Sequence, residues 1–214
     1  MPAVLFDMDG VVIDSERYWP ELESERLFPE VVPGQDVDPE EVMGMNYREI
    51  YDYLAENYEV AVDRDRHVEL FDKLAREIYG ERSSLMDGFD DLLSDLQARG
   101  IAVGLVTSSP PAWIDVVLER FGLTGRFDAV VSAENVQSGK PEPDVYRRAL
   151  QELDAEPDVA VAVEDSTTGA NAANAAGIRC LGYAGVHDGI DPEVVDAVVS
   201  GPERLRTALF EQFE

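Results

Sequence analysis

Short apolar runs alternate with helical hydrophobic patterns through most of the chain. Each run is long enough for a buried strand, and most are followed by a segment in which apolar residues recur every three or four positions. Because strands that alternate with helices form right-handed βαβ units, this order predicts an α/β fold with a Rossmann-like parallel sheet and helices on both faces. The predicted strands span Val4–Phe6, Ile101–Val106, Phe127–Val131, Val159–Val163 and Cys180–Gly182, with a weaker one at Ala197–Val199. Ser109 is predicted to be the N-cap of a helix that begins at Pro110, and an alanine-rich helix is predicted from Gly169 to Ala176.

The stretch from residue 16 to residue 82 does not follow this alternation. It is rich in Glu, Tyr and Arg and has no strand-like apolar run, whereas helical spacing appears around Ile50 and Leu54 and again between Val68 and Ile78. We therefore predict that residues 16–82 form a small helical domain inserted directly after the first strand. Residues 1–15 and 83–214 then form the domain that contains the sheet.

The charge balance is strongly acidic. The 214 residues include 45 Asp and Glu against 17 Lys and Arg, which gives a formal net charge of −28. Such a surface repels nucleic acid and anionic membranes, so we expect neither as a partner. Acidic residues with very little lysine are typical of halophile proteins, for which ~1 M salt shortens the Debye length to roughly 3 Å.

Other features of the composition predict a cytoplasmic protein. The single cysteine, Cys180, excludes an intramolecular disulfide and fits a reducing compartment. No stretch approaches the ~20 apolar residues that a membrane span needs, and the start lacks the basic segment of a secretory leader. We expect a monomer or a weak homo-oligomer.

The motif that follows the first predicted strand carries the most information. Asp7 and Asp9 are separated by one residue, so in an extended chain their side chains point to one face, roughly 6–7 Å apart. Three further polar clusters fall at or just beyond predicted strand ends: Thr107-Ser108, Lys140 and Glu164-Asp165. Each alone has an ordinary structural explanation as a cap, a turn or a surface pair. Because parallel strands bring their carboxyl ends to one crevice, however, the four clusters together predict a site for phosphoryl transfer.

In order and context these clusters resemble the four motifs of the haloacid dehalogenase (HAD) superfamily. The matching stretches are Phe6-Asp7-Met8-Asp9-Gly10, Val106-Thr107, Gly139-Lys140-Pro141 and Glu164-Asp165-Ser166. The inserted domain resembles the helical C1 cap of the subfamily that holds phosphoglycolate phosphatases, sugar phosphatases and β-phosphoglucomutases. The resemblance implies a phosphatase that depends on Mg²⁺ and hydrolyses a small phosphorylated metabolite of the phosphoglycolate or sugar phosphate class.

The resemblance also implies a role for each motif residue. Asp7 attacks phosphorus and becomes an aspartyl-phosphate, while Asp9 protonates the leaving oxygen and later activates water. Thr107 and Ser108 bind phosphoryl oxygens, and Lys140 offsets the charge between the phosphoryl group and Asp7. The metal ligands implied for Mg²⁺ are Asp7, Asp165 and the carbonyl of Asp9, with Glu164 bound directly or through water.

In this family the cap contacts the leaving group, so we expect a substrate-binding segment within the insertion. The candidates are Gly44, Asn46 and Arg48, and the Arg48 guanidinium would suit a carboxylate or a second phosphate, although a surface ion pair explains it equally well. Trp19 is expected to be a packing residue, with substrate contact as the alternative. His67 and His187 are expected to be surface or packed histidines.

Three other functions are alternatives to a phosphatase. A phosphomutase stays open, because the related β-phosphoglucomutases carry a histidine where this chain has Trp19, and that departure favours a phosphatase without settling the matter. A 2-haloacid dehalogenase lacks the second acidic residue of the first motif, so Asp9 counts against it. A phosphate-responsive regulator similar to a receiver domain has its acidic metal pair early in the chain, whereas Glu164-Asp165 comes last.

Overall fold

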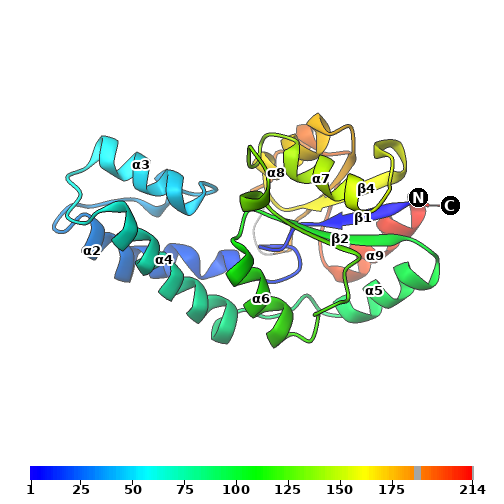
Figure 1. Cartoon of the computed structure of the whole chain (residues 1–214), viewed down its shortest axis with the longest axis horizontal. Coiled ribbons are helices and arrows are strands. Elements are labelled where there is room, and N and C mark those ends of the chain that lie inside the picture. The colour runs from blue at the N-terminus through cyan, green and yellow to red at the C-terminus, as the bar shows by residue number, and fades with distance from the viewer. Residues whose placement is uncertain (186–188, 214) are drawn as a thin grey trace. The chain divides into compact units, whose positions relative to one another are not determined.

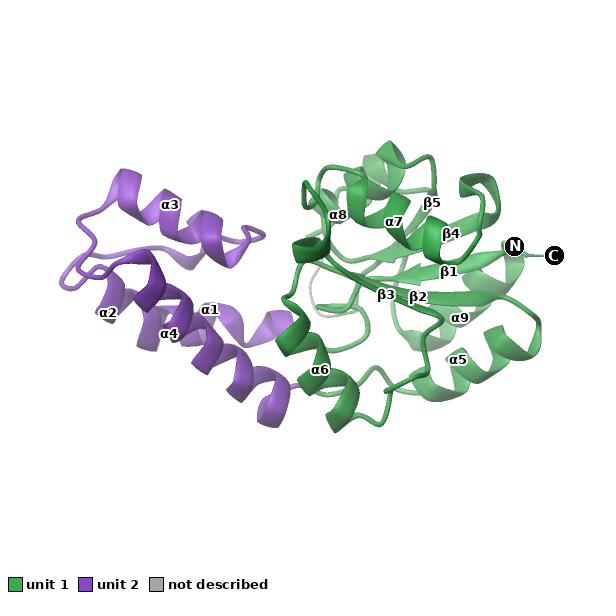
Figure 2. Ribbon diagram, in the orientation of Figure 1, with its two compact units in different colours: residues 1–14, 84–214 green, residues 15–83 purple. Residues whose placement is uncertain are grey.

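The computed structural model describes residues 1–185 and 189–213, so His187 lies outside the described residues. The chain divides into two compact units (Figure 2). The sheet unit consists of Met1–Asp14 and Ser84–Glu214, and the insert unit consists of Ser15–Ser83. Where the chain leaves and re-enters the sheet unit, Asp14 and Ser84 are joined by two hydrogen bonds. These bonds fix the two ends of the insertion side by side.

The sheet unit contains a six-stranded sheet in the order β3-β2-β1-β4-β5-β6. Every neighbouring pair of strands is parallel, which confirms the predicted fold class. All residues of β1, β2 and β4 are buried, as expected for strands covered on both faces. The strands span Ala3–Phe6 (β1), Ala102–Thr107 (β2), Ala129–Ser132 (β3), Ala160–Glu164 (β4), Arg179–Tyr183 (β5) and Ala197–Val199 (β6).

Helices cover the two faces of this sheet (Figure 1). α7 and α8 pack against each other and against β2 to β5, whereas α5 contacts β2 and α9 contacts β6. Small side chains on α8, including Ala170 and Ala173, let this helix lie close to the sheet within the main core cluster. The helices span Phe89–Ala98 (α5), Pro111–Arg120 (α6), Asp144–Glu152 (α7), Thr167–Ala175 (α8) and Pro202–Glu211 (α9), with short 3₁₀ turns at Ala133–Asn135, Pro157–Val159 and Pro192–Val194.

Two helix starts differ from the sequence prediction. The pattern Ser109-Pro110 predicts Ser109 as the N-cap of α6, but Pro110 is the N-cap and Pro111 begins the helix. The predicted N-cap is therefore wrong by one residue, and the Ser109 hydroxyl donates to Asp9, as described below. The helix expected from Gly169 begins at Thr167 instead, because the hydroxyl of Ser166 accepts a hydrogen bond from the Gly169 N–H and caps it.

The insert unit is helical. Its longer helices, α3 and α4, contact each other, and their buried residues recur every three or four positions. His67 is packed between Tyr51 and Phe71, and its Nε2 lies 2.9 Å from the Tyr47 carbonyl. Trp19 packs on Phe71 and Tyr79. The elements span Ser15–Arg17 (η1), Trp19–Leu22 (α1), Glu23–Leu27 (η2), Phe28–Val31 (α2), Pro39–Glu41 (η3), Tyr47–Asn57 (α3), Arg64–Glu77 (α4) and Ile78–Arg82 (η4).

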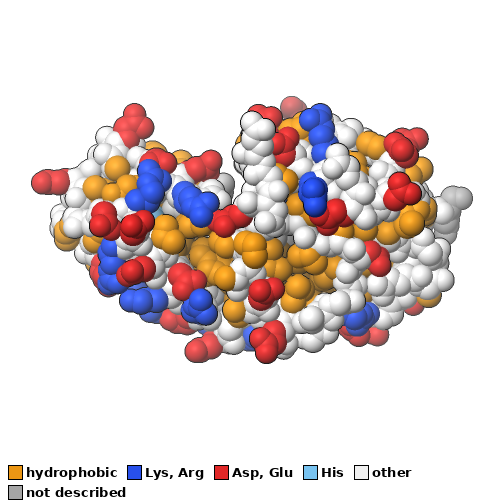
Figure 3. Space-filling model, viewed as in Figure 1, with side chains coloured by type: hydrophobic (Ala, Val, Ile, Leu, Met, Phe, Trp, Pro, Cys, Tyr) orange, Lys and Arg blue, Asp and Glu red, His pale blue; other side chains and the backbone are white. Residues whose placement is uncertain are grey.

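Charged side chains of both signs are spread over the surface. On the face shown in Figure 3, Arg and Lys side chains lie beside acidic ones, and exposed ion pairs include Arg66–Glu69 and Arg76–Asp72. Exposed pairs of this kind contribute little to stability. Within the described residues, every helix is too short or too polar to cross a bilayer.

Candidate active site

Asp7 stands at the carboxyl end of the two central strands. It follows β1 directly, and its backbone N–H donates to the Val163 carbonyl of β4 (3.0 Å), which extends the pairing of these strands by one residue. Gly10 then turns the chain with φ of +73°. Asp7 is only 6% exposed, so its carboxylate lies inside the edge of the sheet rather than on the surface.

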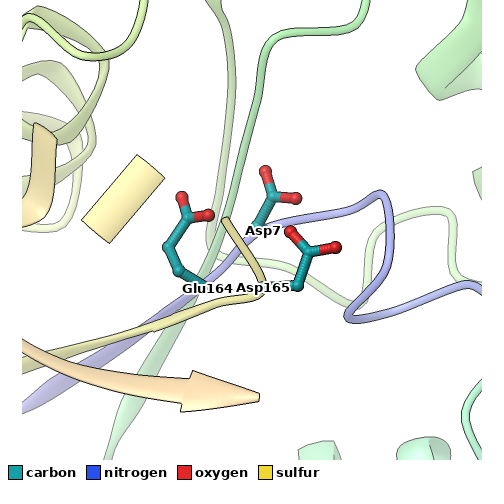
Figure 4. Close-up of side chains that lie close together, drawn as sticks. All are labelled: Asp7, Glu164 and Asp165. Atoms are coloured by element: carbon teal, nitrogen blue, oxygen red, sulfur yellow. The ribbon is translucent and has the colours of Figure 1, made fainter. Parts of the chain in front are cut away.

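Two further carboxylates come from the end of β4. Glu164 is the last residue of that strand, Asp165 is the next, and both are buried. Asp7, Glu164 and Asp165 each offer a carboxylate oxygen, and these oxygens lie within 4.8 Å of one another (Figure 4). The predicted convergence of the β1 and β4 motifs is therefore present in the structure.

Lys140 bridges two of these carboxylates. Its ammonium donates to Oδ1 of Asp7 (2.6 Å), to Oε1 of Glu164 (2.6 Å) and to the carbonyl of Val106 (3.1 Å). These acceptors use all three ammonium hydrogens. The lysine side chain is only 5% exposed, so these bonds form in a low-dielectric environment where charge pairs are strong.

Burial and charge act in opposite directions on these groups. Burial, with a smaller contribution from the nearby Glu164 and Asp9 charges, outweighs the opposing Lys140 charge and raises the pKa of Asp7 to about 8. Burial alone would lower the pKa of Lys140, but the Asp7 and Glu164 charges outweigh burial and raise this pKa well above its usual range. Lys140 therefore stays charged, whereas Asp7 needs positive charge beyond that of Lys140 to be fully ionised at neutral pH.

Two glycines make room for the carboxylates. A Cβ atom at Gly10 would lie 1.7 Å from Oδ2 of Asp165, and one at Gly169 would lie 2.0 Å from Oε2 of Glu164. A side chain at either position would displace a carboxylate. With their all-oxygen donor set, these buried acids fit a hard divalent cation such as Mg²⁺, which would also supply the positive charge that Asp7 lacks.

The loop after β2 brings hydroxyl groups to the same edge of the sheet. Thr107 is buried, and its Oγ1 accepts from the Ser109 N–H (3.0 Å), so its own hydrogen is available to another acceptor. Ser108 is half-buried. The Ser109 hydroxyl donates to Oδ2 of Asp9 (2.9 Å), and the Ser109 carbonyl accepts from Ser132 (2.7 Å). This contact could not be predicted from the sequence, because Ser before Pro is a strong helix-cap signal.

The expected cap residues belong to the insert unit. Asn46 is the N-cap of α3, and with Glu49 it forms a capping box in which each side chain accepts from a backbone N–H. The Arg48 guanidinium lies over the Tyr47 ring, 5.0 Å from its centroid, and Arg48 is exposed. Gly44 has φ of +77° and precedes this helix. Asn46 thus has a structural task that the sequence analysis did not assign.

The chain is similar to a known enzyme family, to named phosphatases and to solved structures. Residues 4–183 match the family described as haloacid dehalogenase-like hydrolase. The phosphorylated carbohydrates phosphatase of Thermotoga maritima is 31% identical over 189 residues, which cover 87% of this chain and 86% of that protein. Hexitol phosphatase B of Escherichia coli K12 is 32% identical over 191 residues, 84% of this chain and 82% of that protein. The crystal structure of a putative β-phosphoglucomutase from Thermotoga maritima has a TM-score of 0.77 at 29% identity and covers 99% of both chains.

Replacing Gly169 with alanine tests whether Glu164 needs the space that this glycine leaves. Within a helix, alanine is normally more stable than glycine by about 1 kcal/mol. Here the new methyl group would displace a buried carboxylate, so we expect Gly169→Ala to lower the melting temperature in thermal unfolding. Asn171→Ala, at an exposed position of the same helix, serves as the control and should not lower it. A Gly169→Ala protein at least as stable as the wild type would contradict this account of the site.

Proposed function

Because the chain belongs to the haloacid dehalogenase-like hydrolases and is a phosphoric monoester hydrolase, we propose that it acts through an aspartyl-phosphate on Asp7. The substrate class that we propose is a small sugar phosphate or phosphoglycolate. One observation carries the proposal: the Asp7 carboxylate is buried at the carboxyl end of the central strands, bonded to Lys140, with the Asp165 carboxylate beside it. A carboxylate held in this way can attack phosphorus, because the neighbouring cation offsets its repulsion of the phosphoryl group.

In the first step, a carboxylate oxygen of Asp7 forms a bond to phosphorus as the bond from phosphorus to the leaving oxygen breaks. Asp9 donates a proton to that oxygen, so the product leaves as an alcohol. The hydrogen bond from Ser109 to Oδ2 orients the Asp9 carboxyl group for this transfer. Asp9 thereby becomes a carboxylate and is ready to accept a proton.

In the second step, water attacks the phosphorus of the aspartyl-phosphate. Asp9 takes a proton from this water, and the bond between phosphorus and the Asp7 oxygen breaks. Inorganic phosphate leaves, Asp7 is restored as a carboxylate and Asp9 as an acid. The two steps balance, and together they hydrolyse one phosphoric monoester.

The remaining motif residues stabilise negative charge on the phosphoryl group. The Thr107 hydroxyl, whose oxygen already accepts from Ser109, has its hydrogen to donate to a phosphoryl oxygen, and Ser108 follows it on the same loop. Lys140 neutralises part of the charge where Asp7 approaches phosphorus. Because catalysis of phosphoryl transfer is mostly positioning and electrostatic stabilisation, fixed donors in a buried site are what the reaction needs.

We propose Mg²⁺ as the cofactor, held by Asp7, Asp165 and the Asp9 carbonyl, with Glu164 close by. The ion would supply positive charge that ionises Asp7 and polarises the phosphoryl oxygens. The support for this set is the buried cluster of three carboxylates and the space that Gly10 leaves for Asp165. Oxygen ligands of this kind suit Mg²⁺, which keeps several waters.

A phosphomutase is the second candidate, because the similar solved structure quoted above is named a putative β-phosphoglucomutase. Trp19 stands where the related mutases carry a histidine, and its ring packs inside the insert unit. A mutase returns the phosphoryl group to its substrate, whereas a phosphatase releases it to water. Release of inorganic phosphate in step with loss of substrate therefore separates the two.

We propose that the insert unit supplies the contacts that select the leaving group, through Gly44, Asn46 and Arg48. In support, the similar phosphatases are named for different substrates, phosphorylated carbohydrates in one and hexitol in the other. Selection must then come from residues outside the phosphoryl site. Arg48 is the clearest candidate, because it is an exposed residue with a charged side chain and Asn46 is already engaged in capping α3.

The first test of the proposed function concerns Asp7. Asp7→Asn removes the attacking charge with almost no change in volume, so we expect p-nitrophenyl phosphate hydrolysis to fall by at least about 10³-fold while circular dichroism stays that of the wild type. Asp91→Asn, at an exposed position on α5, is the matched control and should hydrolyse at the wild-type rate. Substantial activity in folded Asp7→Asn would exclude Asp7 as the nucleophile.

The second test concerns the metal. EDTA should stop hydrolysis and Mg²⁺ should restore it. We expect Asp165→Ala to raise the Mg²⁺ concentration for half-maximal rate much more than Glu164→Ala does, because Oε1 of Glu164 is already engaged by Lys140. Calorimetric titration of the two variants with Mg²⁺ checks the same order without turnover. Full activity in a sample shown by elemental analysis to be free of divalent metal would rule out the proposed cofactor.

The third test concerns Arg48. Arg48→Ala should change kcat/KM by unequal factors across a panel of sugar phosphates and phosphoglycolate, because leaving groups differ in what they offer a guanidinium. Hydrolysis of p-nitrophenyl phosphate should change less than about twofold, since this leaving group offers neither a carboxylate nor a second phosphate. Arg76→Ala, at an exposed position of the same unit, is the control. An equal loss for every substrate would show that Arg48 does not select the leaving group.

A further inference from the structure

Tyr146 is a buried residue of α7 whose hydroxyl enters the candidate active site. Its side chain is 0% exposed and belongs to the core cluster that also contains Ala149 and Cys180. Phenylalanine would fill the same space, so packing does not require the hydroxyl group. That hydroxyl donates to Oε1 of Glu164 at 2.5 Å.

We propose that Tyr146 is a positioning residue, whose hydroxyl fixes Glu164 against Lys140 and thereby keeps Lys140 aligned with Asp7. The inference rests on the proposed function, since it assigns a role to Tyr146 in that same site. It goes beyond the four motifs, because Tyr146 lies on the helix that follows the third of them and touches none of the reacting atoms.

The Glu164 carboxylate is held mainly through one of its two oxygens. Its Oε1 accepts from both Tyr146 (2.5 Å) and Lys140 (2.6 Å), whereas its Oε2 lies 3.4 Å from the Ser166 hydroxyl. Gly169 leaves the space that the carboxylate occupies, but this space alone does not fix the Glu164 side chain in one rotamer. The hydrogen bond from Tyr146 fixes the Glu164 rotamer, because a charge-assisted O–H···O⁻ bond is short and directional.

Lys140 depends on Tyr146 in two ways. Its ammonium has three hydrogens and three acceptors, on Asp7, Val106 and Glu164, so it has no spare donor. Its Nζ also lies 5.5 Å from the centroid of the Tyr146 ring, which is within the range of a cation–π contact. Tyr146 thus acts on Lys140 through its ring directly and through its hydroxyl by way of Glu164. Loss of the hydroxyl would let Glu164 rotate and would loosen one of three bonds to the ammonium.

Tyr146→Phe, which keeps the ring and removes only the hydroxyl, tests the proposal. We expect kcat for p-nitrophenyl phosphate at saturating Mg²⁺ to fall about 10- to 100-fold, the factor expected for a hydrogen bond to a charged group, with KM nearly unchanged. Tyr183→Phe, at a buried tyrosine of β5 in the same unit, is the matched control and should keep the wild-type kcat. If Tyr146→Phe kept the wild-type kcat, or lost its fold, the hydroxyl would have a structural role only and the proposal would be overturned.

A second measurement needs neither metal nor turnover. The chain has only two lysines, Lys73 and Lys140, so ¹⁵N-lysine labelling gives one ammonium signal from the site and one from exposed Lys73 as an internal reference. In metal-free protein we expect hydrogen exchange of the Lys140 ammonium to be at least tenfold faster in Tyr146→Phe than in the wild type or in Tyr183→Phe. Unchanged exchange would overturn the proposal even if kcat fell.

A double-mutant cycle shows whether the effect passes through Glu164. When Glu164→Ala already removes the carboxylate, adding Tyr146→Phe should lower kcat by less than about twofold. An additional loss as large as in the wild-type background would mean that Tyr146 acts by another route and would overturn the proposal. The proposed function fails separately, if Asp7→Asn stays active. If Asp7→Asn is inactive while Tyr146→Phe behaves as the wild type, only the role of Tyr146 is lost.

Discussion

The buried ammonium of Lys140 is the interaction on which the rest of the candidate site depends. It joins Asp7 at the end of β1 to Glu164 at the end of β4, and it also bonds to the end of β2 through the Val106 carbonyl. Without a cation at this point, the carboxylates would repel one another and the pKa of Asp7 would be raised further. In a chain with a net charge of −28, Lys140 and the Mg²⁺ that we propose would together offset the charge of a phosphate dianion at this site.

Around this contact the fold supplies position as well as charge. Parallel pairing of β1 with β4 sets the carboxylates side by side, and glycines at positions 10 and 169 leave the space that they occupy. Neutral hydroxyl groups then hold two of the carboxyl groups, Ser109 on Asp9 and Tyr146 on Glu164. The phosphoryl chemistry that we propose therefore needs only the sheet unit, and the insert unit can vary with the leaving group.

Much of this arrangement could be predicted from the sequence, because strand periodicity and the positions of polar residues at strand ends are local signals. They predicted the parallel sheet, and they predicted that Asp7, Glu164 and Asp165 lie at one edge of it. The supporting contacts could not be predicted, since they join residues far apart in the chain. Ser109 is read from sequence as a helix cap and Tyr146 as a core residue. Glu23 is buried in the insert unit, and burial raises its pKa to about 8. Nothing in the sequence distinguishes it from the many other acidic residues, so its burial could not be predicted.

The central claim is that Asp7 carries the phosphoryl group between the two steps. Rapid acid quench during turnover, reduction with borohydride and mass spectrometry of the peptides tests it directly, because borohydride converts an aspartyl-phosphate to homoserine. The account predicts homoserine at position 7 in the wild type, and at no position when substrate is omitted. Homoserine at another aspartate, or steady turnover with no reducible acyl-phosphate at any quench time, would contradict it.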